Sequence, residues 1–137
     1  MTEKELNSVR ELNKQIRRQE QHLQALRLSA ENLVPILDGL PHSNEAKSRV
    51  EKIALMIIES ERELDSLHKE LMTAKSELVD KILREVDAPA LQTLLALRYV
   101  ECLSFKETAR RMRFTLRHVF RLHEKFLKCH IAAQNHV

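Results

Sequence analysis

Two long stretches of the chain repeat apolar residues in a heptad pattern. The first repeat consists of Val9, Leu12, Ile16, Leu23, Leu26, Ala30, Leu33 and Leu37, with one polar interruption at Gln19. The second consists of Val50, Ile53, Ile57, Ser60, Leu64, Leu67, Leu71, Ala74 and Leu78. A stripe this narrow is typical of a helix in a coiled coil rather than of a helix in a globular core. The sequence therefore predicts helices over about 3–37 and about 44–86.

The break between the two repeats lies at residues 38–42. Gly39 favours the end of a helix, and Pro41 is incompatible with its continuation. Because this connection is short, we expect the two helices to fold back on each other in antiparallel orientation. Counting outward from the break keeps the two stripes in phase over their length. Residues 1–87 are therefore predicted to form a long antiparallel coiled-coil hairpin.

Three apolar residues of the second stretch, Leu55, Met56 and Ile58, lie off the stripe. A two-helix hairpin buries little surface, so further apolar residues indicate a second contact surface. We expect the hairpin to self-associate through this region into a homodimer or a larger homo-oligomer. The alternative is a single hairpin with a few exposed apolar side chains, which are common on protein surfaces.

Residues that interrupt helices are scarce, since the chain has one Gly and three Pro among 137 residues. The expected fold class is therefore all-α. The sequence has no uncharged apolar run of the length of about 18 residues that suggests a membrane span. Its N-terminus also lacks the apolar segment of a secretory signal. We expect a cytoplasmic protein in which Cys102 and Cys129 are reduced thiols.

Residues 88–137 are predicted to form a second domain of three helices. Asp87 is a suitable N-cap, and Pro89 fits the first turn of a helix after a bend at residues 86–88. The core residues expected from this helix are Leu91, Leu94, Leu95, Leu97 and Val100. A domain of about 40 residues rarely has a sufficient core of its own. We therefore expect it to pack against the base of the hairpin or against a second subunit.

Residues 104–128 carry the signals of two short helices joined by a tight turn. Ser104 and Glu107 have the spacing of a capping box, in which each side chain accepts from the other residue's N–H. Thr115 supplies a second N-cap, so only Arg113 and Phe114 separate the helices. Small and apolar residues recur at helical spacing in both: Phe105, Thr108, Ala109 and Met112, then Val119, Leu122, Phe126 and Leu127. The pattern predicts a helix-turn-helix.

Charge is distributed unevenly along the chain. Residues 1–87 carry 14 basic and 17 acidic side chains, a net charge of −3. Residues 88–137 carry nine basic and three acidic side chains, a net charge of +6. Neutralisation of DNA phosphates requires such a basic cluster. The alternative interpretation of the charge is an ordinary solvated helix face. We therefore predict that the C-terminal domain binds double-stranded DNA.

The C-terminal helices resemble the fourth region of sigma-70-type transcription factors, whose helix-turn-helix reads promoter DNA. The segment RHVFRLHEKFL, residues 117–127, is also similar to small phage and prophage regulators of the ArpU and RinA type. The resemblance covers roughly residues 89–129 and rests on Ser104, Glu107, Ala109, Met112, Thr115, Val119, Leu122 and Leu127. It implies a sequence-specific transcription regulator encoded by a phage or prophage, with RNA polymerase as a further expected partner.

The register of this family places side chains toward bases and phosphates from the second helix. Together with basic residues that precede this helix and are expected to hold the DNA backbone, the predicted contact residues are Arg110, Arg111, Arg113, Thr115, Leu116, Arg117, His118, Phe120, Arg121 and Lys125. The chain departs from the family at Arg113, where the turn usually has Gly. It also departs at Leu116 and Phe120, which are apolar at positions where the family usually has polar side chains that contact bases. These two residues either pack on thymine methyl groups or are buried against the neighbouring domain or a partner.

No catalytic constellation is evident, because the chain lacks a Gly-rich phosphate loop and a nucleophile paired with a base. We therefore expect neither an enzyme nor a cofactor. Cys129 and His130, taken with His118 and His123, do not have the spacing of a zinc site. The competing function is a protein-interaction module, a coiled-coil adaptor that binds RNA polymerase or another protein without specific DNA readout. Salt-sensitive binding to duplex DNA distinguishes the two functions.

Overall fold

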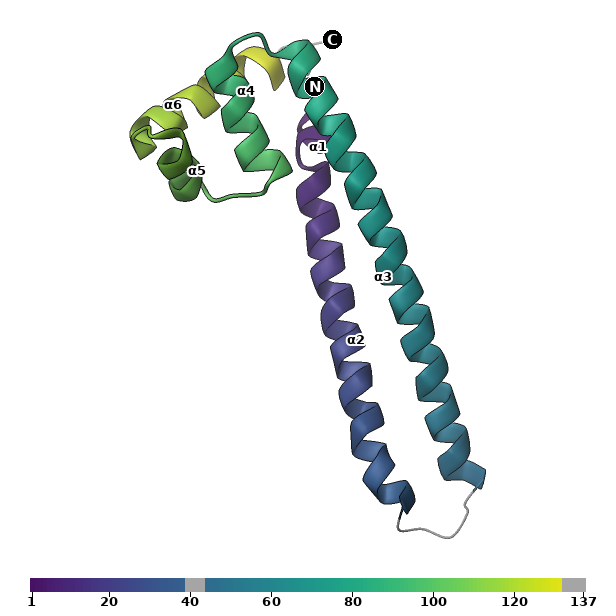
Figure 1. The fold of residues 1–137 in the computed structure, drawn as a ribbon. Coiled ribbons are helices and arrows are strands. Elements are labelled where there is room, and N and C mark those ends of the chain that lie inside the picture. Colours follow the sequence, from purple (N-terminus) through teal and green to yellow (C-terminus); the bar gives the residue numbers. More distant parts are fainter. Residues whose placement is uncertain (39–43, 132–137) are drawn as a thin grey trace. The chain divides into compact units, whose positions relative to one another are not determined.

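The computed structural model describes residues 1–38 and 44–131, and every regular element among them is a helix. In chain order the elements are α1 (Glu3–Leu6), α2 (Ser8–Asp38), α3 (Asn44–Glu85), α4 (Pro89–Leu95), η1 (Ala96–Val100), α5 (Phe105–Met112), α6 (Leu116–Phe126) and η2 (Leu127–Ile131), where η marks a π-helical turn (Figure 1). The predicted all-α class is confirmed. The predicted break at Gly39 and Pro41 lies outside the described residues.

The chain divides into two compact units. Unit 1 contains Met1–Leu12 and the described part of Leu71–Val137, and unit 2 is Asn13–Glu70. This division differs from the predicted one, in which the first domain ends at residue 87. Residues 1–12 and 71–86, which we call the base, share an apolar core with the helices that follow them, and therefore belong to the same unit.

Unit 2 consists of parts of α2 and α3 that pack along the predicted apolar stripe. Its most buried apolar residues are Ile16, Leu23, Leu26 and Leu67, and its half-buried ones include Ala30, Leu33, Val50, Ile53, Ile57 and Leu64. At the surface, Arg27 Nη2 lies 3.1 Å from Glu61 Oε1. The stripe is thus confirmed for these residues, while Leu55, Met56 and Ile58 are exposed.

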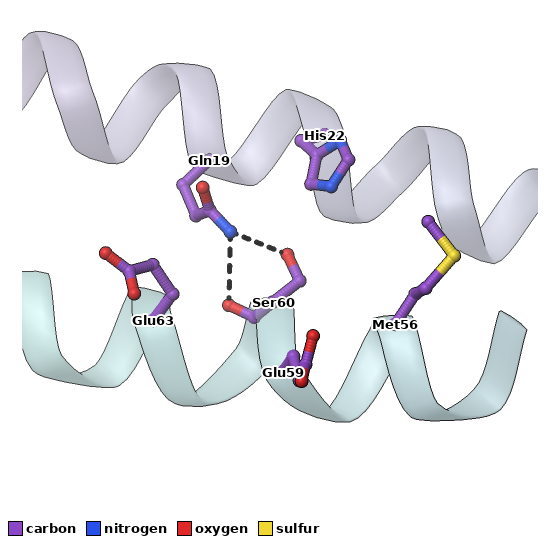
Figure 2. Close-up of a pocket in the computed structure, with 6 residues that line it drawn as sticks. All are labelled: Gln19, His22, Met56, Glu59, Ser60 and Glu63. Atoms are coloured by element: carbon purple, nitrogen blue, oxygen red, sulfur yellow. Dashed lines mark hydrogen bonds between the residues drawn. The ribbon is translucent and has the colours of Figure 1, made fainter. Parts of the chain in front are cut away.

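The polar interruption in the stripe, Gln19, is paired with the other polar residue of the stripe. Its side-chain amide donates to Ser60 Oγ at 2.9 Å, and Ser60 is only 4% exposed (Figure 2). Figure 2 also shows that the two helices run in opposite directions, because Gln19 lies near Glu63 and His22 lies nearer Met56. The Gln19 amide also lies 3.5 Å from the Ser60 carbonyl oxygen. A buried polar group with a partner avoids the cost of desolvation, so the pairing of Gln19 with Ser60 allows both polar residues in the stripe.

The base of unit 1 begins with α1, which is separate from α2 rather than continuous with it as predicted. Asn7 interrupts the helix with φ −91° and ψ 3°. A capping box between Thr2 and Glu5 begins α1. The Met1 amino group lies 2.9 Å from Glu85 Oε2, and Lys81 Nζ lies 2.6 Å from Glu5 Oε1. These two ion pairs join α1 to the C-terminal end of α3 in antiparallel orientation.

One apolar core joins the base to the C-terminal helices. The base contributes Met1, Leu6, Val9, Leu78, Ile82 and Val86, and the later helices contribute Leu94, Leu95, Tyr99, Val100, Ala109, Val119 and Phe126. This confirms that the small C-terminal domain packs against the base. A core of this size needs both parts, because three short helices alone bury little apolar area.

The helix after the base differs from its prediction in two places. Its N-cap is Ala88, without a side-chain cap, so the predicted cap at Asp87 is wrong. The predicted bend at residues 86–88 is present. Leu97, predicted to be core, is only half-buried, whereas Tyr99 is buried. The π-helical turn η1 explains this shift, because an i to i+5 turn changes which residues face the core.

Candidate nucleic-acid interface

The helix α5 begins at the predicted cap, but only half of the capping box is formed. Ser104 Oγ accepts a hydrogen bond from the Glu107 N–H at 3.1 Å. The Glu107 carboxylate does not return to Ser104. It lies instead 2.7 Å from Arg110 Nη2 and 3.4 Å from Arg111 Nε. The hydrogen bond from Arg110 lowers the pKa of the Glu107 carboxyl, so at neutral pH Glu107 offsets part of the charge of two predicted contact residues.

The turn between α5 and α6 contains a left-handed residue that is not glycine. Arg113 has φ 59° and ψ 36°, in the region where a Cβ atom is unfavourable. The chain reverses there because the Arg113 N–H donates to the Arg110 carbonyl and the Phe114 N–H donates to the Ala109 carbonyl. Thr115 then caps α6 by accepting from the His118 N–H at 3.1 Å. Both predicted N-caps of these helices are therefore confirmed.

Every predicted contact residue is exposed. They lie on the last turn of α5, in the turn, and on α6, and comprise Arg110, Arg111, Arg113, Thr115, Leu116, Arg117, His118, Phe120, Arg121 and Lys125. The structure thus brings all of them onto one continuous segment of unit 1. Exposure is necessary for a contact with DNA, although it is equally compatible with a solvated surface.

The helix α6 has a buried face and a face rich in arginine. Val119 and Phe126 are buried in the core of unit 1. Away from the core, α6 carries two exposed pairs whose members lie one turn apart, the apolar pair Leu116 and Phe120 and the basic pair Arg117 and Arg121. Among the described residues, neither arginine of the basic pair has a carboxylate partner. Their guanidinium groups are therefore available to an anionic ligand.

Phe120 is exposed but not isolated. Its ring lies 4.8 Å from the Phe105 ring, centroid to centroid, at an interplanar angle of 42°. The Arg98 guanidinium carbon lies 4.2 Å from the centroid of the Phe105 ring, a cation–π distance. Arg98 is held in turn by a hydrogen bond from Nη1 to the Leu103 carbonyl at 2.7 Å. Helical periodicity does not reveal these contacts, because they join residues from three different elements.

Behind this face, His123 forms a hydrogen bond with the Tyr99 hydroxyl. The His123 ring also lies 4.9 Å from the Phe105 ring in an edge-on arrangement. Burial lowers the pKa of His123, and the positive charges of Arg98 and Arg10 lower it further. Burial also raises the pKa of Tyr99. His123 is therefore a neutral structural residue at physiological pH, and it supports α6 from the side of η1.

The described residues offer little to other kinds of site. In residues 1–38 and 44–131 no three His, Cys, Asp or Glu side chains gather as ligands for a metal ion. Among the described residues, Cys102 and Cys129 form no disulfide, and the Cys102 thiol donates to the Tyr99 carbonyl at 3.7 Å. None of the helices in the described part of the chain is both long and apolar enough to cross a membrane.

Comparison with known proteins gives no relative from which a function can be transferred. No protein-family model matches the chain. No curated protein and no solved structure matches it either.

Proposed function

We propose that this chain is a sequence-specific DNA-binding transcription regulator whose helix α6 enters the major groove. The observation that carries the proposal is the exposed face of α6, on which Arg117 and Arg121 lie one turn apart without a carboxylate partner among the described residues. An arginine can bind the O6 and N7 atoms of guanine in bidentate fashion. The capped helices α5 and α6, separated by a tight turn, support a helix-turn-helix mode of docking.

The basic residues before α6 have a different role in this proposal. Arg110 and Arg111 at the end of α5, and Arg113 in the turn, are exposed beside the N-terminus of α6. Contacts from such residues to phosphates fix position and register on the duplex but carry no sequence information. Because Glu107 already neutralises part of the charge of Arg110 and Arg111, Arg113 is the strongest candidate of the three for a phosphate contact.

A salt titration of the affinity for duplex DNA tests the proposal. The logarithm of the association constant should fall linearly with the logarithm of salt concentration. The double variant Arg117→Ala/Arg121→Ala should reduce the magnitude of that slope by about 1 for each phosphate that the variant no longer neutralises. The matched control is Arg17→Ala/Arg18→Ala, which removes two exposed charges from α2 in unit 2 and should leave the slope unchanged. An affinity independent of salt would contradict the proposal.

Self-association belongs to the same proposal. Leu55, Met56 and Ile58 are exposed on unit 2, and burial of such side chains favours a homodimer or larger homo-oligomer. A two-fold dimer would place two copies of α6 on a palindromic or repeated site. Sedimentation equilibrium that detects only monomer at tens of micromolar would contradict this part.

The resemblance to the fourth sigma region supports a phage or prophage regulator that acts in the cytoplasm and contacts RNA polymerase. The second candidate function is a protein-interaction module without specific DNA readout. The exposed apolar pair Leu116 and Phe120 favours this alternative, because apolar side chains also cover protein surfaces. The two candidate functions differ in one measurable property. A regulator binds specific duplex sequences through the face of α6, whereas a protein-interaction module does not.

A further inference from the structure

The exposed face of α6 contains apolar as well as basic side chains. Leu116 is 42% exposed and Phe120 is 47% exposed. They lie one helical turn apart, so both side chains project from the same side of the helix. Apolar side chains at this level of exposure contribute little to the core of unit 1, whose α6 members are Val119 and Phe126.

The position of the Phe120 ring is restrained from one side. Phe105 packs against it at 4.8 Å, and Arg98 lies over Phe105 at 4.2 Å. The exposed Phe120 ring is therefore one end of a series of side-chain contacts that runs through Phe105 to Arg98 of η1. Such a support fixes the orientation of the ring before a ligand binds, which reduces the entropic cost of binding.

The surroundings of the pair favour a polyanion as the ligand. Exposed basic residues flank Leu116 and Phe120 in the turn and along α6, namely Arg113, Arg117 and Arg121. No acidic residue occurs between positions 108 and 123. A protein surface that covers an apolar pair within this cluster must also neutralise it. Duplex DNA supplies the negative charge through its phosphates and supplies one apolar group in the major groove, the thymine C5 methyl.

We infer that Leu116 and Phe120 read thymine methyl groups in the major groove, and that the preferred DNA sites contain thymine at the positions which these two side chains reach. This inference rests on the proposed DNA-binding function and adds the base class that the site recognises. Arg117 and Arg121 would read guanine or hold phosphates on the same face, so the site would combine thymine with guanine or with backbone contacts.

Replacement of thymine by deoxyuridine tests the inference, because it removes the methyl group and leaves base pairing intact. The full-length protein would first be used to select a site from random duplex DNA. Duplexes with single thymine-to-deoxyuridine changes would then be compared. Wild type should lose about fourfold in affinity for each contacted methyl group, given the transfer energy of one buried methylene. In Leu116→Ala and in Phe120→Ala, the change from thymine to deoxyuridine should no longer lower the affinity at one of the positions.

Matched variants separate this readout from a general loss of binding. Arg117→Ala should bind more weakly but keep the same ratio between thymine and uracil duplexes. Leu28→Ala, which truncates an exposed residue of unit 2 that is not among those proposed for self-association, should retain both affinity and ratio. Circular dichroism of each variant would show whether the helices are intact, and little change is expected for exposed positions.

The outcomes distinguish the inference from the function on which it rests. Specific binding to a site without thymine, or equal affinity for thymine and uracil duplexes, would overturn the methyl readout and leave the DNA-binding function standing. Absence of saturable binding to any duplex would overturn both, and would assign Leu116 and Phe120 to a protein surface.

Discussion

The rings of Phe105 and Phe120 lie 4.8 Å apart, one at the first residue of α5 and the other midway along α6. Ala109 of α5 and Val119 of α6 both belong to the buried core of unit 1. The relative orientation of α5 and α6 is therefore held by buried core residues and, nearer the surface, by the contacts of Phe105 with Phe120 and His123.

Arg113 is expected to cost stability because it adopts a left-handed conformation. Arg113→Gly should raise the free energy of unfolding by about 0.5–1 kcal/mol, since a left-handed residue with a Cβ atom costs about 1–2 kcal/mol and glycine offsets part of this gain by its own entropy. Urea denaturation would measure the change. The same variant should weaken binding to DNA through the loss of a basic side chain.

Arg111→Gly is the matched control for this variant. It removes the same side chain and the same charge, but Arg111 lies inside α5. Glycine within a helix destabilises it by about 1 kcal/mol, so the two substitutions should have opposite effects on stability. Destabilisation by Arg113→Gly as large as that by Arg111→Gly would contradict the role assigned to the left-handed turn.

Gln19 and Ser60 are expected to depend on each other. Gln19→Ala leaves the buried Ser60 hydroxyl without its side-chain partner and should lower the free energy of unfolding by about 1–3 kcal/mol. Replacement of both by apolar residues, Gln19→Leu/Ser60→Ala, should recover most of that loss, because an apolar pair needs no hydrogen bond. Denaturation of wild type, Gln19→Leu, Ser60→Ala and the double variant Gln19→Leu/Ser60→Ala closes a cycle that gives the coupling free energy. Additive effects of the two changes would show that the hydrogen bond contributes nothing.

His123 should make unit 1 less stable in acid. The pKa of His123 is lowered in the folded protein by burial and by Arg98 and Arg10, so the unfolded chain binds a proton more readily than the folded one. Its contribution to stability is therefore complete above the unfolded pKa of about 6.5 and is lost as the pH falls through the folded pKa.

Thermal denaturation between about pH 5 and 7.5 would measure this dependence. His123→Gln retains a hydrogen-bonding partner for Tyr99 but does not titrate, so the decline below about pH 6.5 should become smaller. His118→Gln is the control, because His118 is an exposed residue of the same helix and should leave the profile of the wild type unchanged. Greater stability of the wild type at acid pH would contradict the account.

The sequence predicts those parts of the fold that depend on spacing along one helix. The buried stripe through Ile16, Leu23 and Leu67 follows from heptad periodicity, and the caps at Ser104 and Thr115 follow from local hydrogen-bonding chemistry. Such signals involve residues within a few positions of each other, so they are visible without tertiary structure.

Other features depend on contacts between elements and were therefore missed or predicted wrongly. Glu107 was expected to complete a capping box, but two arginines one turn along α5 compete for its carboxylate. Asp87 was expected to cap α4, but the helix begins one residue later and leaves Ala88 at the cap. The hydrogen bond between Tyr99 and His123 arises only when η1 and α6 pack together.

The candidate site divides in the same way. Charge and helical register predict the exposed positions of Arg117 and Arg121, and the structure agrees. The sequence left open whether Leu116 and Phe120 are buried against the base. The structure shows that they are exposed, because Val119 and Phe126 already fill the contact between α6 and the core.

Selection of bound fragments from random duplex DNA shows whether α6 reads a specific DNA sequence. Wild type would be compared with Arg117→Ala/Arg121→Ala and with the control Arg17→Ala/Arg18→Ala. We expect an enriched motif that the wild type and the control share and that the α6 variant loses. No enrichment by the wild type, with all three proteins equally weak on DNA, would contradict the claim and favour a protein partner for the same face.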